Sequence, residues 1–126
     1  MSTNFILQND NMRPRDEVRI ESLTASPYPD GRRVHVEITV TPFRERPNLD
    51  ITIISGDGQP VAATSAIEIM GFRVSFNLHL RGIDQPAGEY TVRVLLYYED
   101  LDQPQDRRDV ALHIPPATSP PGNEPG

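Results

Sequence analysis

Residues 72–81 read FRVSFNLHLR, and this stretch decides the fold class. Apolar residues alternate with arginine, serine, asparagine and histidine along its whole length. A period of two is that of a β-strand with one buried face and one hydrated face, as in antiparallel sheets. The residues predicted to face the core are Phe72, Val74, Phe76, Leu78 and Leu80.

The same alternation returns in residues 33–41, where the core-facing residues are Val34, Val36, Ile38 and Val40. Less regular strands are predicted at 17–25, 49–55, 60–63, 66–70, 89–99 and 107–114. In the first of these, the alternation breaks between Ile20 and Leu23, which predicts a β-bulge or kink. Turn-forming residues separate the strands, as in the hairpin signal Asp57-Gly58.

Seven or eight short strands separated by turn signals predict an all-β fold, an antiparallel two-sheet Greek-key sandwich, with a closed barrel as the alternative. We expect one domain over residues 17–114. Residues 1–16 are polar and non-periodic, and we expect them to form a flexible leader. Residues 115–126, PPATSPPGNEPG, have almost no apolar side chain to bury, so we expect a disordered Pro-rich tail.

A short motif opens the strand predicted at 89–99. Residues 88–92 read GEYTV, which resembles the G-x-Y-x-C start of strand F in immunoglobulin-like domains. The resemblance implies that Tyr90 forms a tyrosine corner, with its ring at the edge of the core and its hydroxyl bonded to backbone just upstream. The aspartate that the family has four residues before the tyrosine is replaced by Pro86.

The resemblance also implies how the core replaces the disulfide and tryptophan of that family. Val92 takes the place of the second cysteine, and Val36 or Ile38 that of the first; Ile51 replaces the tryptophan. The chain is thus similar to disulfide-free bacterial immunoglobulin-like and fibronectin-III-like modules. This likeness implies a fold and no function, because the sandwich supports many unrelated roles.

The composition narrows the class of partner. The 126-residue chain carries a formal charge of −6, which argues against a nucleic-acid partner. It contains no cysteine and no apolar run of the ~20 residues that span a membrane. The start of the chain lacks the features of a signal peptide, so we expect a cytoplasmic protein if residue 1 is the natural start.

We expect no enzymatic activity, no cofactor and no small-molecule ligand. Cysteine is absent, and no serine lies in a G-x-S-x-G elbow. A zinc site formed by His35 and His79 lacks a third ligand, so no metal site is predicted.

Two charged regions give weaker candidates for a site. Strand parity places a basic stripe on one outward face, which is either an anion or acidic-partner site or an ordinary hydrated face; its residues are Arg33, His35, Arg73, His79 and Arg81. The loop at 99–106 offers carboxylates for a calcium- or carbohydrate-binding module, which is the alternative function; a hydrated loop is the simpler interpretation. Its residues are Glu99, Asp100, Asp102 and Asp106.

The outward parity of the strand that begins at Tyr90 is unusual. Leu95 and Tyr97 occupy successive outward positions, although an exposed strand face seldom carries two such residues. We therefore predict a non-enzymatic module that contacts a protein, either a different one or a second copy. The contact is expected through the C-F-G face, the outward side of the strands predicted at 49–55 (C), 89–99 (F) and 107–114 (G). The predicted interface is Ile54, Arg93, Leu95, Tyr97 and Ala111. The alternatives are scattered exposure, or cover by the leader, through residues 5–7, or by the tail.

Overall fold

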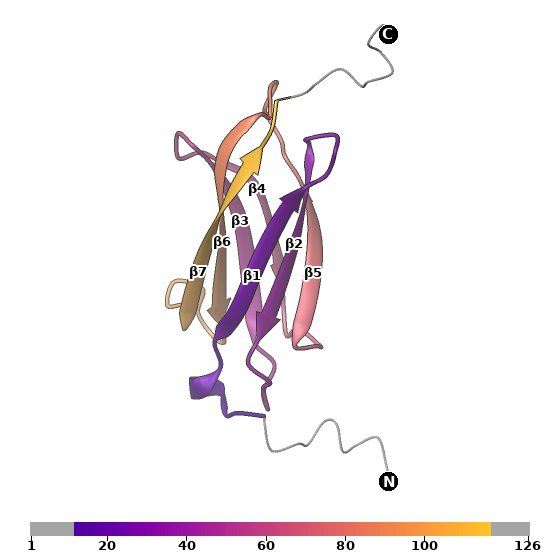
Figure 1. Cartoon of the computed structure of the whole chain (residues 1–126). Helices are drawn as coiled ribbons and strands as arrows, with labels where there is room; N and C mark the ends of the chain where they lie inside the picture. The colour runs from indigo at the N-terminus through magenta and orange to yellow at the C-terminus, as the bar shows by residue number, and fades with distance from the viewer. Residues whose placement is uncertain (1–11, 117–126) are drawn as a thin grey trace, which may run out of the picture.

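The computed structural model describes residues 12–116, which form an all-β, two-layer antiparallel sandwich (Figure 1). The elements are the 3-10 turn η1 (Arg15–Glu17) and the strands β1 (Ile20–Pro27), β2 (Arg33–Val40), β3 (Asn48–Ser55), β4 (Pro60–Ala66), β5 (Arg73–His79), β6 (Gly88–Tyr97) and β7 (Asp106–Ile114). The predicted fold class is confirmed. The expectations for the leader before residue 12 and the tail after residue 116 lie outside the described residues.

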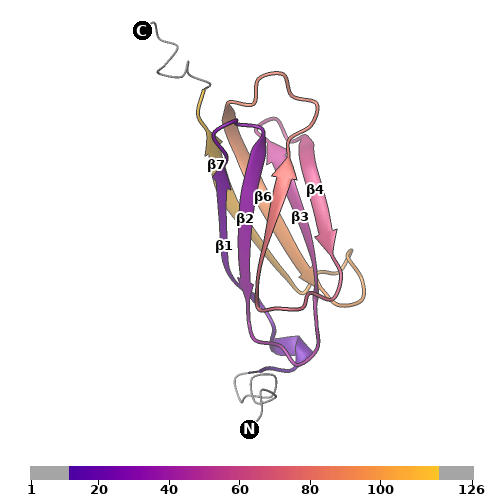
Figure 2. The same ribbon diagram turned by 90° about the vertical axis from the view of Figure 1, so that its right-hand side faces the viewer.

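The strands divide into a three-stranded sheet, β1-β2-β5, and a four-stranded sheet, β4-β3-β6-β7. In the constant-type immunoglobulin fold the fourth strand extends the first of these sheets. Here β4 pairs with β3 instead and forms an edge of the second sheet. The loops gather at the two ends of the strands (Figure 2), so the described loops leave the outer faces of both sheets uncovered.

The core follows the predicted alternation. Val34, Val36, Ile38 and Val40 on β2 are fully buried between the sheets. On β5, Leu78 is buried but the inward-facing residues before it are only half-buried, because β5 is an edge strand with a neighbour on one side. Each fully buried valine or isoleucine contributes about 1.5–3 kcal/mol to the hydrophobic free energy of folding.

The irregular first strand contains the predicted bulge. The register of β1 against β2 passes from Ile20↔Val40 to Ser22↔Thr39, so the strand gains one residue at Glu21. This extra residue resets the alternation and allows both Ile20 and Leu23 to reach the core.

The tyrosine corner is confirmed. The Tyr90 ring is buried, and its hydroxyl donates to the carbonyl oxygen of Pro86 at 2.6 Å. A proline thus serves here as well as any residue, because the acceptor is its backbone. Val92 and Ile51, which replace the cysteine and the tryptophan of the family, are fully buried on β6 and β3.

One predicted strand is wrong. Residues 66–70 do not form a strand of their own: β4 ends at Ala66 and the chain bends. Glu68 has a left-handed φ of 51°, which breaks the alternation suggested by the isoleucines on either side. As a result Ile69 is buried whereas Ile67 is 65% exposed.

Candidate functional site

The residues predicted for the interface lie together on the outward side of the four-stranded sheet, which we call the outer face. The register places Thr91 of β6 between Ile54 of β3 and Ala111 of β7. Two residues further along β6, Arg93 lies between Thr52 and Asp109. The structure therefore brings these residues onto one surface, and their role in binding stays a prediction.

A cluster of charges crosses the outer face. The guanidinium of Arg93 donates twice to the carboxylate of Asp109, at 3.2 and 3.3 Å, and Arg107 donates to the same carboxylate at 3.0 and 3.3 Å. Burial would raise the pKa of Asp109, but the hydrogen bonds and positive charges of the two arginines outweigh it and hold that pKa below its usual value. The three side chains form one hydrogen-bonded group with one excess positive charge.

Leu95 adjoins this cluster, and Tyr97 lies two residues further along β6. Both are half-buried. In the register, Leu95 lies between Asp50 and Arg107, whose side chains flank it. The apolar area is therefore smaller than the sequence suggests, and it is framed by charges. The alternative of cover by residues 5–7 lies outside the described part of the chain.

The basic stripe lies on the outward side of β2 and β5, as predicted from parity. Arg33 binds the carboxylate of Asp30 at 3.0 Å, and its guanidinium carbon stacks 4.4 Å from the centre of the Tyr28 ring. This arginine is thus already partnered within the chain.

The other members of the stripe are less engaged. Nδ1 of His35 lies 3.0 Å from the side-chain oxygen of Asn77 on β5. Arg73, His79 and Arg81 are exposed, and none forms an ion pair with another residue in the range 12–116. The structure spreads these residues along the sheet, and their role in anion binding stays a prediction.

The acidic residues of the loop at 99–106 turn in different directions. Asp106 accepts the backbone N–H of Ile20 at 2.8 Å, and Asp100 accepts that of Asp102 at 2.9 Å. Glu99 binds an arginine of η1 at 3.3 Å. Within the described residues, no group of three or more side chains of the kinds that ligate metals converges.

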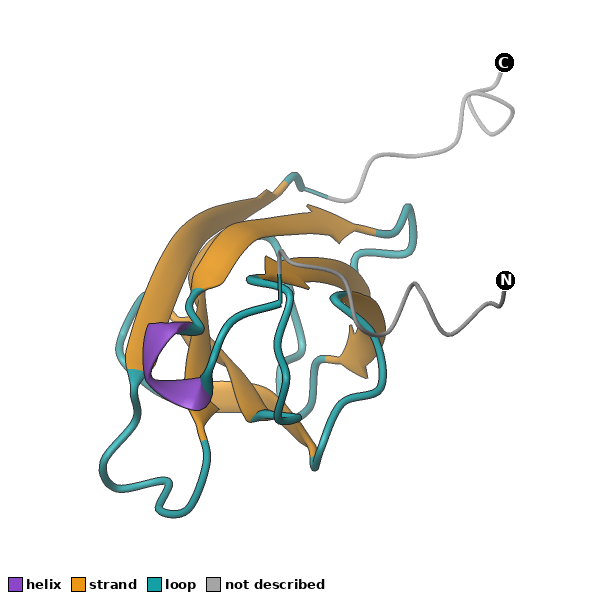
Figure 3. Cartoon of the chain, turned by 90° about the horizontal axis from the view of Figure 1, so that it is seen from below, coloured by secondary structure: helices purple, strands orange, loops and turns teal. Residues whose placement is uncertain are grey.

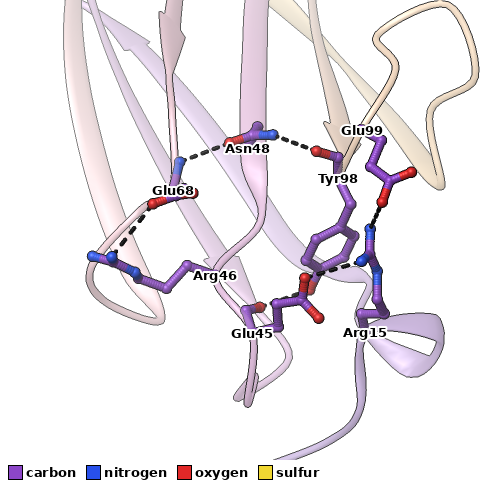
Figure 4. A pocket seen from close by; sticks show the side chains of 7 residues that line it. All are labelled: Arg15, Glu45, Arg46, Asn48, Glu68, Tyr98 and Glu99. Carbon is purple, nitrogen blue, oxygen red and sulfur yellow. Dashed lines mark hydrogen bonds and ion pairs between the residues drawn. The ribbon is translucent and has the colours of Figure 1, made fainter.

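Figure 3 views the sandwich from the end that carries η1. This end holds a pocket that the sequence did not suggest. Its volume is about 260 Å³. The lining residues, drawn in Figure 4, are Arg15, Glu45, Arg46, Asn48, Glu68, Tyr98 and Glu99.

One side of the pocket is organised by Arg15. It binds Glu45 at 3.0 Å and Glu99 at 3.3 Å, and its guanidinium carbon lies 4.5 Å from the centre of the Tyr98 ring. The Tyr98 hydroxyl donates to the backbone oxygen of Glu45 at 2.9 Å. Burial and the nearby Glu45 carboxylate raise the pKa of Tyr98 to about 12, so the phenol keeps its proton at neutral pH.

The other side is organised by Asn48, a buried polar residue. Its amide donates to the backbone oxygen of Tyr98 at 2.9 Å, and its side-chain oxygen accepts the N–H of Glu68 at 2.7 Å. This second bond holds Glu68 in its left-handed conformation, and Arg46 pairs with the Glu68 carboxylate at 3.4 Å. The pocket therefore ties together loops from distant parts of the chain, with its charged groups already paired.

The sequence matches no protein-family model and no curated protein. Solved structures do match the fold. A glycosyl hydrolase family 2 member from Bacteroides cellulosilyticus DSM 14838 aligns with a TM-score of 0.58 and 15% identity, over 77% of this chain and 15% of that one. A Bifidobacterium dentium β-glucuronidase complexed with coumarin-3-O-glucuronide aligns with a TM-score of 0.61 and 18% identity, over 79% of this chain and 18% of that one.

These likenesses show the sandwich fold alone. The chain corresponds to less than a fifth of either of those chains. No helix in residues 12–116 has the length and apolar character needed to cross a membrane.

Proposed function

We propose that this chain is a non-catalytic β-sandwich module that binds another protein through its outer face. The observation that carries the proposal is the pair Leu95 and Tyr97, which occupy successive outward positions in an inner strand of the sheet and keep part of their surface exposed. Tyrosine and arginine, both present on the outer face, are enriched at the centres of protein interfaces.

The geometry of the outer face suits a specific contact. Leu95 would bury apolar area, Tyr97 would add its ring and a hydroxyl, and Arg93 is held in place by the carboxylate of Asp109. Holding a long side chain before binding reduces the conformational entropy lost on association.

The comparisons agree with a module of this kind. In the two enzyme chains described above, the matching sandwich is a small part of a much longer protein. That arrangement is consistent with a domain that contacts other protein surfaces while chemistry takes place elsewhere.

Site-directed photo-crosslinking tests the proposal. A photoreactive residue placed at Leu95 should capture a protein in a lysate of the source cells, and the same residue placed at Ser75, exposed on the other sheet, should not. Adding Tyr97→Glu to the Leu95 probe should remove the captured band, because it introduces a charge into the contact. Equal capture at both positions, or capture that survives Tyr97→Glu, would show that the outer face is not the binding surface.

A further inference from the structure

β4 differs from the other edge strands of the sandwich. Natural proteins protect sheet edges with charges, bulges or prolines, because an unpaired edge can bind another strand. The other edges have such features: the bulge and Pro27 on β1, Arg73 and His79 on β5, and Arg107, Arg108 and Asp109 on β7. β4 also begins with a proline, Pro60, and has a bulge at Val61, but its remaining residues, 62–66 (AATSA), include no charged side chain, bulge or proline.

The free side of β4 is almost unoccupied. Its only backbone bond to a described residue other than those of β3 runs from the N–H of Arg81 to the oxygen of Val61, at 2.9 Å. From Ala62 to Ala66 the strand pairs with β3 alone (Figure 2). Five consecutive residues therefore present half of their backbone groups to one side without a partner in the described chain.

The sequence of this edge is nearly symmetric. Residues 61–67 read VAATSAI, and about Thr64 each residue is matched by a similar one: Val61 with Ile67, Ala62 with Ala66, Ala63 with Ser65. Two copies paired antiparallel about Thr64 would place each residue opposite its match. Thr64 would then lie opposite Thr64 of the other copy, and threonine pairs stabilise neighbouring strands.

The charge of the molecule points to the same surface. The chain has a formal charge of −6, so two copies repel one another over most orientations. An uncharged edge avoids that repulsion at the point of contact.

We propose that the chain self-associates through β4, forming a two-fold symmetric dimer in which the two four-stranded sheets join into one. The contact is isologous, so it closes on itself and does not propagate. The dimer does not depend on the proposed function, since the outer face lies on the surface of the joined sheet and stays open to a different protein.

The experiment measures self-association of the full 126-residue chain by sedimentation equilibrium up to millimolar concentration. Wild type should form a dimer. The double variant Ala63→Lys/Ser65→Lys places like charges opposite one another across the two-fold axis and should weaken the dimer by about tenfold or more. The matched control, Thr24→Lys/Ser26→Lys, adds the same charges at exposed positions of β1 and should dimerise as wild type does.

A charge-swapped mixture makes the test independent of folding defects. Ala63→Glu/Ser65→Glu should be monomeric alone, and mixing it with the lysine variant should restore a one-to-one dimer, because each lysine then faces a glutamate. A wild type that is monomeric throughout, a dimer unaffected by the lysines, or a mixture that fails to associate would overturn the proposal. Binding of β4 to a strand of another protein in place of its own copy would also overturn it.

Discussion

The two sheets approach each other along two pairs of edge strands, and these two pairs are built differently. On one side, β1 of the three-stranded sheet lies beside β7 of the four-stranded sheet (Figure 1), and side chains of β7 bind the backbone of β1. On the other, β5 lies near β4, and a single backbone bond from Arg81 to Val61 joins this edge of β4 to the segment after β5. We call these the closed side and the open side.

The closed side depends on the bulge in β1. Asp106 accepts the N–H of Ile20 at 2.8 Å, and Arg108 donates to the carbonyl oxygens of Ile20 and Glu21 at 3.0 and 3.3 Å. These bonds satisfy backbone groups at the irregular point of the strand. Side chains of the edge strand β7 thus bind backbone groups of the edge strand β1. Residues 62–66 of β4 receive no such side-chain bond from the described residues.

Loss of the carboxylate at Asp106 should have the largest effect. Asp106→Ala leaves the N–H of the buried Ile20 without its partner, so we expect a loss of about 1–3 kcal/mol in the free energy of unfolding. Urea denaturation measures this. Asp102→Ala, in the exposed loop before β7, is the control and should change stability little. Equal losses in the free energy of unfolding for the two variants would show that the bond from Asp106 to Ile20 does not stabilise the fold.

Truncation of Arg108 should rank second. Arg108→Ala removes two hydrogen bonds to backbone carbonyls on the closed side, at a cost of about 1 kcal/mol. The control is Arg81→Ala on the open side, because Arg81 bonds through its backbone, which the substitution keeps. If Arg81→Ala proved the more costly of the two in urea denaturation, the distinction between the sides would be wrong.

The effect of acid on stability through Asp109 of β7 should be smaller than either of these losses. The pKa of Asp109 is lower in the folded chain than in the unfolded one, so its stabilising contribution is present at neutral pH and is lost as pH falls below about 4 through the lowered pKa. The group is partly exposed, so the effect should be at most about 0.5 kcal/mol. The stability difference between wild type and Asp109→Asn should shrink as pH falls; a constant difference would contradict this account.

A charge on the open edge should have the smallest effect on the folding of the single chain. Ser65→Lys at low protein concentration should change the free energy of unfolding by no more than about 0.5 kcal/mol, because Ser65 is exposed and lies outside the core. Its hydroxyl does lie 3.0 Å from a carboxylate oxygen of Asp50, to which a lysine can also bind. A loss of several kcal/mol would show that the β4 edge is packed against something.

The sequence predicted the parts of the fold that depend on local pattern. Alternation placed Val34 to Val40 in the core, and the broken alternation near Ile20 predicted the bulge. The resemblance around Tyr90 implied a hydrogen bond from its hydroxyl to backbone just upstream, and in the structure the acceptor is the carbonyl oxygen of Pro86. Each of these signals lies within a few residues of the structure that it specifies.

The rest depends on contacts between distant residues. Asp106 looked like one member of an acidic loop, but its partner Ile20 lies 86 residues away. Asn48, which directly precedes the strand predicted at 49–55, bridges Glu68 and Tyr98, 20 and 50 residues away. Such side-chain bonds leave no periodic pattern, so the pocket and the closed side could not be predicted before the register was known.

Hydrogen exchange tests the central contrast most directly. At low protein concentration, the amide of Ile20 on the closed side should exchange slowly, whereas the alternate amides of β4 that point away from β3 should exchange much faster. Raising the concentration should slow the β4 amides and leave Ile20 unchanged, because the second copy covers the open edge. Slow exchange of all β4 amides in the dilute chain, or fast exchange of Ile20, would contradict the account.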